Sequence, residues 1–180
     1  MFSSHAQERI LVADDDDFVR RYFRDFLTRR GYPVVTVPNG AVALERAGTG
    51  AFSLLILDLE MGQPSGLEVI RELRSGGSQT PIILMSGSFS LKGLAQTPPE
   101  AGVAYLTKPF TGSELEAAIQ KGMALSLTVP CRHCGRPIPF LKREGEHSLG
   151  CPACGELTRV TAVYESGELR IRTQPAPPPP

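Results

Sequence analysis

Two short cysteine motifs constrain the C-terminal part of this chain more tightly than any other feature. The chain has four cysteines, and all of them lie in two CxxC motifs: Cys131, Cys134, Cys151 and Cys154. Two such motifs separated by the length of one β-hairpin, residues 135–150, are typical of a tetrahedral zinc site made of four thiolates. Glycine follows each motif and lets the backbone turn so that amides face the thiolates. The sequence therefore predicts a small zinc-binding module, separate from residues 1–125.

Two disulfides or four free thiols are the alternatives to zinc. Disulfides need an oxidising compartment, whereas residues 1–9 are polar and lack the features of a signal peptide. No apolar run is long enough to span a membrane, so we expect a cytoplasmic protein with reduced thiols. His133 and His147 are expected to be loop residues, because four thiolates already complete the site.

The distribution of charge argues against a strong electrostatic grip on nucleic acid. Residues 1–126 carry 12 Lys and Arg against 14 Asp and Glu, and residues 127–180 carry 7 against 5. Zinc with four thiolates contributes a net charge of about −2, which brings the loaded module close to neutral. Nucleic-acid binding needs clustered excess Lys and Arg, so nucleic acid is the less favoured partner.

Apolar runs and helical patterns alternate along the first two thirds of the chain. Five runs predict strands at residues 10–13, 34–37, 54–57, 82–85 and 103–106. Helical patterns cover residues 18–27, 41–47, 67–73 and 112–124, with a weak one at 91–95 that ends before Pro98 and Pro99. This alternation predicts an α/β domain with a five-stranded, parallel, doubly wound sheet and helices on both faces.

Polar residues follow the strands at the edge where such a sheet places its chemistry. They are Asp14 and Asp15 after the first strand, Asp58 after the third, Ser86 after the fourth and Lys108 after the fifth. Open α/β sheets bind ligands outside the carboxyl ends of their strands. Crowded carboxylates repel one another, and a hard divalent cation or a lysine supplies the missing counter-charge.

These residues and their surroundings resemble the receiver domain of two-component response regulators, which has a flavodoxin-like fold. The matching stretches are residues 10–16, 55–61, 83–87 and 105–110, and the resemblance covers about two thirds of the chain. It implies that Asp58 accepts a phosphoryl group. It further implies a Mg²⁺ site formed by three carboxylates and one backbone carbonyl, those of Asp14, Asp15, Asp58 and Glu60.

The resemblance also assigns the residues that respond to phosphorylation. Ser86 and Lys108 correspond to the residues that bind the phosphoryl group, and Tyr105 to an aromatic side chain that turns inward with Ser86. Pro109 corresponds to a proline after a cis peptide bond. One departure concerns the loop after Asp58, because the family usually has Met-Pro where this chain has Met61 and Gly62.

The expected organisation has five parts. They are an N-terminal extension (1–8), a receiver domain (9–125), a linker (126–130), an all-β zinc ribbon (131–173) and a proline-rich disordered tail (174–180). Alternating residues at 158–164 and 169–172 predict a hairpin in the ribbon. Arg159, Arg170 and Arg172 would share one solvated face of it.

The sequence therefore indicates a response regulator that is phosphorylated on Asp58 with Mg²⁺ and signals through a zinc-ribbon interaction module. We expect no enzymatic activity beyond its own phosphorylation and dephosphorylation. The expected partners are a sensor histidine kinase or phosphotransfer protein and a protein target of the ribbon, with no membrane. Two alternatives stay open: a transcriptional regulator whose ribbon binds DNA, and a pseudo-receiver that binds partners without phosphorylation.

Overall fold

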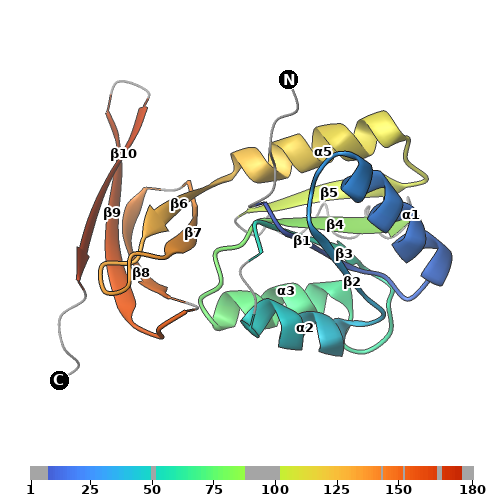
Figure 1. Cartoon of the computed structure of the whole chain (residues 1–180), viewed down its shortest axis with the longest axis horizontal. Coiled ribbons are helices and arrows are strands. Elements are labelled where there is room, and N and C mark those ends of the chain that lie inside the picture. The colour runs from blue at the N-terminus through green and yellow to red at the C-terminus, as the bar shows by residue number, and fades with distance from the viewer. Residues whose placement is uncertain are drawn as a thin grey trace.

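The computed structural model describes residues 8–49, 52–87, 102–142, 144–151, 153–165 and 168–175. The helix expected at residues 91–95 and most of the expected N-terminal extension lie outside these residues. Figure 1 shows two units, an α/β domain that runs from β1 to α5 and a ribbon that runs from β6 to β10.

The α/β domain contains the predicted five-stranded sheet. Its strands are β1 (Ile10–Ala13), β2 (Val34–Val37), β3 (Leu54–Asp58), β4 (Ile82–Gly87) and β5 (Val103–Lys108). They pair in the order β2-β1-β3-β4-β5, and each neighbouring pair is parallel. The predicted fold class, a doubly wound parallel sheet, is confirmed.

Helices cover both faces of this sheet because its central strands are apolar on both sides. The helices are α1 (Asp17–Arg29), α2 (Gly40–Thr49), α3 (Gly66–Ser75) and α5 (Gly112–Ala124). In β1, Ile10 and Val12 pack in the core beneath α1 and α5, whereas Leu11 and Ala13 pack in the core beneath α2 and α3 (Figure 1). Alternate residues of one strand thus build two separate cores.

Two helix caps fix the loops that follow β3 and β5. Ser65 and Glu68 form a capping box that begins α3, and Thr111 and Glu114 form one that begins α5. A capping box satisfies backbone amides that the first turn of a helix leaves free. At the start of α3 only glycine fits, because a Cβ on Gly66 would lie 2.4 Å from the carbonyl oxygen of Asp58. This close approach places α3 directly against the end of β3.

The ribbon is an antiparallel all-β unit, as expected. Its strands are β6 (Ser126–Pro130), β7 (Pro137–Leu141), β8 (Gly145–Gly150), β9 (Leu157–Glu165) and β10 (Glu168–Pro175). Strands β6 and β7 form one sheet, and a second has the order β10-β9-β8. The predicted hairpin of β9 and β10 is present.

One expectation about the ribbon is wrong: the segment between the two CxxC motifs is not a hairpin. β7 pairs with β6, and β8 pairs with β9. Each CxxC motif is itself the turn of a hairpin, because the amide of Cys131 donates to the carbonyl of Arg136 and the amide of Cys151 donates to the carbonyl of Glu156. Each of these bonds joins the two ends of one CxxC loop, so the chain reverses direction within each motif.

The expected linker and the expected start of the tail are also wrong. Residues 126–130 form β6, in which Val129 is buried and Leu127 packs against the ribbon core. The alternation of apolar and polar residues there is that of a strand with one buried face. At the other end, Gln174 and Pro175 pair with β9 as part of β10.

The ribbon contacts the α/β domain at the amino-terminal edge of its sheet. The chain passes from α5 into β6, and the amide of Lys142 donates to the carbonyl of Leu125 across this junction. Leu141 is buried, and a Cβ on Gly102, just before β5, would lie 2.5 Å from its methyl groups. The side chain of Leu141 therefore packs directly on the backbone that leads into β5.

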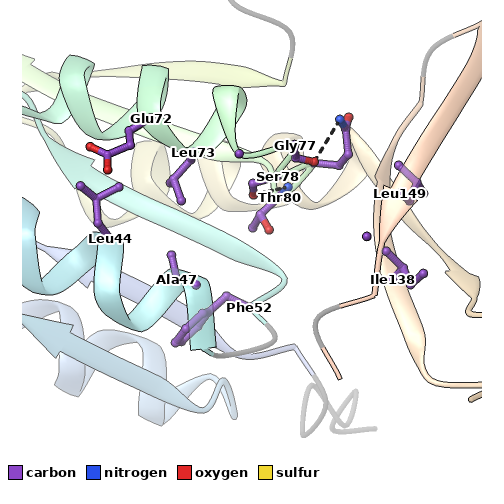
Figure 2. A pocket seen from close by; sticks show the side chains of 14 residues that line it. Leu44, Ala47, Phe52, Glu72, Leu73, Gly77, Ser78, Thr80, Ile138 and Leu149 are labelled. Atoms are coloured by element: carbon purple, nitrogen blue, oxygen red, sulfur yellow. Dashed lines mark hydrogen bonds between the residues drawn. The ribbon is translucent and has the colours of Figure 1, made fainter. Parts of the chain in front are cut away.

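On the other side of this contact the two units are separated by a cavity of about 420 Å³. Figure 2 shows Leu44, Ala47 and Phe52 on the α/β side facing Ile138 and Leu149 of the ribbon. In the part of the chain that the structure describes, the ribbon is thus attached along α5 and β5 and is not packed against the ends of α2 and α3.

Candidate functional site

Three carboxylates converge at the carboxyl ends of β1 and β3. The oxygens of Asp14, Asp15 and Asp58 all lie within 4.8 Å of one another. Asp14 and Asp58 are buried, and Asp15 is exposed at the rim. The sheet topology explains this meeting, because β1 and β3 are neighbours and run in the same direction. Oxygen ligands at such spacing suit a hard divalent cation.

Lys108 completes the site from the end of β5. Its Nζ lies 2.9 Å from Oδ2 of Asp14 and 2.9 Å from Oδ1 of Asp58, so one ammonium group bridges both buried carboxylates. Burial lowers the pKa of Lys108, but its hydrogen bonds to the two carboxylates outweigh this effect and raise the pKa above its ordinary value. Lys108 is therefore firmly protonated at neutral pH.

The charge of the site remains unbalanced even with Lys108 in place. Burial raises the pKa of Asp58 above its ordinary value; the hydrogen bond and charge of Lys108 oppose this rise, and the charges of Asp14 and Asp15 add to it. Three carboxylates thus share one ammonium group. A divalent cation would lower the repulsion that remains, and the residues present fit such an ion.

The other residues predicted from the sequence lie in or just after β3, β4 and β5. Ser86 is 1% exposed, and its hydroxyl donates to the carbonyl of Gly87 at 3.2 Å. Tyr105 is 39% exposed and is therefore not turned inward. Glu60 lies in the loop after β3. The peptide bond between Lys108 and Pro109 is cis, as the sequence suggested.

Two features near the site were missed by the sequence analysis. A second cis peptide bond joins Gln63 to Pro64, and Gly62 has a φ of 85°, a value that proline cannot adopt. Arg20 reaches back from α1, and its Nη1 donates to the carbonyls of Asp14 and Asp15 at 2.8 Å each. No local pattern distinguishes Arg20 from the other arginines of α1, so this contact had no signal in the sequence.

The four cysteines form a second candidate site in the ribbon. Their sulfur atoms all lie within 4.8 Å of one another, and none forms a disulfide. Sγ of Cys131 lies 3.7 Å from that of Cys154, and Sγ of Cys134 lies 3.6 Å from that of Cys151. A tetrahedral ion with Zn–S bonds of about 2.3 Å would place its sulfurs about 3.8 Å apart. The cluster therefore has the dimensions of a four-thiolate zinc site.

Backbone amides prepare one thiol of this cluster to act as a thiolate. The amides of Cys134 and His133 both point at Sγ of Cys131, at 3.5 and 3.4 Å. The hydrogen bond from Cys134 is the main cause that lowers the pKa of Cys131 to about 6. The cluster is made of the four cysteines alone among the described residues, and neither His133 nor His147 belongs to it.

Comparison with known proteins agrees with the fold of the α/β domain. The sequence model of the response regulator receiver domain matches residues 10–120. The chain belongs to the response regulator receiver family. Among curated relatives, YkoG of Bacillus subtilis, an uncharacterised transcriptional regulatory protein, is 36% identical over 114 residues, which are 63% of this chain and 50% of that protein.

Two further curated relatives show the same partial coverage. The response regulator MprA of Mycobacterium ulcerans is 38% identical over 112 residues, which are 62% of this chain and 48% of that protein. The regulatory protein AtoC of Escherichia coli is 27% identical over 167 residues, which are 92% of this chain and 36% of that protein. The chain thus spans about half or less of the length of these relatives.

Solved structures match the receiver. The response regulator TrrA of Thermotoga maritima, in complex with Mg²⁺-BeF, is 34% identical with a TM-score of 0.57, covering 64% of this chain and 98% of that one. A receiver protein of Sinorhizobium medicae is 30% identical with a TM-score of 0.57, covering 65% of this chain and 94% of that one. Among the described residues, no helix combines the length and apolar character needed to cross a membrane.

Replacing Lys108 with methionine should destabilise the protein in the absence of divalent cations. Two buried carboxylates would lose their shared counter-charge, and because the Lys108 side chain is 30% exposed, we expect a loss of about 1–3 kcal/mol in the free energy of unfolding. Added Mg²⁺ should recover much of it. Urea denaturation with EDTA and then with Mg²⁺ measures both effects. Lys121→Met, at an exposed position of α5, is the control, and equal losses in the two variants would contradict this account.

Proposed function

We propose that this receiver is a phosphorylation-driven signalling protein that takes a phosphoryl group on Asp58 and passes the signal on through its ribbon. The observation that carries the proposal is the bridge from Lys108 to the two buried carboxylates of Asp14 and Asp58. A carboxylate is a modest nucleophile, so transfer to it depends on position and on neutralised charge. The bridge from Lys108 supports both the positioning of Asp58 and the neutralisation of charge.

In the proposed reaction, a carboxylate oxygen of Asp58 attacks the phosphorus of a phosphohistidine on a sensor kinase or phosphotransfer protein. The new P–O bond forms while the P–N bond to the donor imidazole breaks, and the imidazole keeps that electron pair and takes a proton. Mg²⁺, held by Asp14, Asp15, Asp58 and the carbonyl of Glu60, would offset charge on the phosphoryl oxygens. Beyond this self-phosphorylation and its hydrolysis we assign no enzymatic activity.

Phosphorylation would then rearrange the surrounding side chains. Lys108 would leave its bridge and pair with a phosphoryl oxygen, which carries more negative charge than the carboxylate it replaces. The hydroxyl of Ser86, which now donates to Gly87, would turn to the phosphoryl group. Tyr105, which is exposed before phosphorylation, would fill the space that Ser86 leaves.

We further propose that the ribbon holds one Zn²⁺ on its four thiolates. The sulfur spacing and the two matched loops support this assignment. The ribbon core is small, and two of its eight buried residues are cysteines, Cys131 and Cys151. A metal ion would therefore supply much of the folding free energy of the unit, on the order of 10 kcal/mol.

The path from receiver to ribbon that we propose runs through β5 and α5. Lys108 ends β5, and the start of β5 contacts Leu141 of the ribbon. The cavity beside this contact leaves room for the ribbon to pivot about the junction of α5 and β6 (Figure 2). A shift of β5 on phosphorylation would thus change the angle between the ribbon and the receiver.

Nucleic acid remains the less favoured target of the ribbon. Arg159 lies on β9, and Arg170 and Arg172 lie on β10. The register of these two strands places all three side chains on the same face of the hairpin. Glu165 lies on the same face and pairs with Arg170 at 3.0 Å. A face with both signs of charge does not provide the excess of basic residues that phosphate backbones require, so we propose a protein partner.

Asp58 should become phosphorylated when the protein is incubated with Mg²⁺ and a small donor such as acetyl phosphate. Intact-mass spectrometry would detect the adduct, and EDTA should prevent it because the transfer needs charge neutralisation. Asp58→Asn should abolish labelling, whereas Asp25→Asn, at an exposed position of α1, should leave it unchanged. Failure of the wild type to label with several donors would instead favour a pseudo-receiver.

Removal of zinc should unfold the ribbon and spare the receiver, because their cores are formed by separate sets of residues. Elemental analysis should give one zinc per chain, and Cys151→Ser or a strong chelator should remove it. Amide hydrogen exchange should then rise by orders of magnitude from β6 onward, with the receiver still protected. His133→Ala, inside the first CxxC motif, should keep its zinc. A zinc-free protein with a protected ribbon would refute the assignment.

Leu141→Ala should uncouple the ribbon from the receiver. Loss of its buried side chain should cost about 2–5 kcal/mol of local stability and free the start of β5 from the ribbon. In the wild type, beryllofluoride with Mg²⁺ should alter amide exchange in both units; in the variant the ribbon should no longer respond. Leu157→Ala, at an exposed leucine of the ribbon, should behave as the wild type. An unchanged ribbon response in Leu141→Ala would argue against this path.

A further inference from the structure

Arg20 ties helix α1 to the loop that carries two of the three carboxylates. One guanidinium nitrogen, Nη1, donates to the carbonyl oxygen of Asp14 at 2.8 Å and to that of Asp15 at 2.8 Å. The second, Nη2, donates to Oδ1 of Asp17 at 3.1 Å. The side chain is only 16% exposed. A single planar group thus holds two consecutive carbonyls and is itself held by a third contact.

These contacts restrict the backbone from which the two carboxylates extend. Each peptide unit is planar, so fixing the direction of a carbonyl fixes the whole plane that contains it. Two fixed planes, one after Asp14 and one after Asp15, leave little freedom for the Cα–Cβ bond of Asp15 that lies between them. Asp14 is further held by its amide, which donates to Val37, and by Lys108. Asp15 lies exposed at the rim, so the contact with Arg20 matters most for its position.

We propose that Arg20 is a positioning residue that sets the geometry of the metal-binding carboxylates. It does so through backbone carbonyls and touches neither the cation nor the phosphoryl group. The proposal rests on the proposed function, in which Asp14 and Asp15 hold Mg²⁺. Mg²⁺ demands a nearly ideal octahedron, so a small rotation of either carboxylate would reduce its affinity.

The shape of the arginine side chain is what suits it to this task. A guanidinium group presents its donors in a rigid plane, and the two hydrogens of Nη1 diverge to reach two acceptors. Lysine carries the same charge on a flexible stem, with three donors that rotate freely. Lysine at position 20 would therefore keep the charge near the acidic loop and lose the fixed direction of the two carbonyls.

Arg20 could act by positioning the carboxylates or only by its positive charge, and these two roles predict opposite effects of its removal on Mg²⁺ affinity. If Arg20 acts only as a positive charge, its removal should strengthen the binding of a cation nearby. If Arg20 positions the carboxylates, its removal should weaken binding in spite of the lost repulsion. If it only stabilises the fold, stability should fall while the affinity of the folded protein stays the same. One measured affinity therefore separates the three roles.

The test compares Arg20→Lys and Arg20→Met with the same substitutions at Arg21. Arg21 is the adjacent residue of α1, is 67% exposed, and pairs with Oδ2 of the same Asp17 at 2.6 Å. It therefore matches Arg20 in charge and location but not in its contacts with the backbone. Isothermal titration calorimetry of the full, unphosphorylated chain with MgCl₂ gives the affinity. Urea denaturation in EDTA gives the stability separately.

We expect both Arg20 variants to bind Mg²⁺ about tenfold more weakly or worse, the effect typical of residues that orient metal ligands. Both Arg21 variants should bind as tightly as the wild type or more tightly. Unchanged or tighter binding in the folded Arg20→Lys variant would overturn the inference and leave the proposed function intact. A wild-type protein that does not bind Mg²⁺ would overturn both.

Discussion

The ammonium group of Lys108 between two buried carboxylates is the interaction on which the rest of the receiver depends. Burying Asp14 and Asp58 without a counter-charge would cost several kcal/mol, and the parallel sheet brings them together by placing β1 beside β3. β5 pairs with β4 at the edge of the same sheet; Asp58 is level with Met85 and Leu106, and the long side chain of Lys108, which follows at the end of β5, reaches both carboxylates. The site is therefore a consequence of strand order and direction, and one ammonium group for three carboxylates leaves it poised for a cation.

Much of the α/β domain could be predicted because its signals are local. Five apolar runs, each followed by a polar residue or a turn, defined the strands, and the helical spacing of apolar residues between them defined the helices. The residues of the acidic site followed from their positions at strand ends. The contact of Arg20 could not be predicted in this way, because it depends on how α1 is rotated about its axis. The helical pattern alone does not determine which of the several arginines on α1 faces the acidic loop.

The ribbon shows where local patterns fail. The cysteine spacing predicted the thiolate cluster. The pairing of the strands around it, however, depends on which loops reverse the direction of the chain. The amides of Cys131 and Cys151 close the two CxxC loops, so each motif turns a hairpin, and the longer segment between them connects two sheets. The same rule explains why residues 126–130 are a strand: β7 needs a partner, and the chain that enters the first loop supplies it.

The acidic site and the ribbon lie at opposite edges of the receiver sheet. The acidic site lies at the carboxyl edge of the sheet and the ribbon at the amino edge, so in the proposed function a signal would have to cross the length of a strand or helix. β5 does so directly, with Lys108 at one end and the contact of Gly102 with Leu141 at the other. α5 begins just after Pro109 and passes into β6 without a linker. Because α2 and α3 end at a cavity instead of a packed interface, a change on their side of the sheet has, among the described residues, no equally direct contact through which to move the ribbon.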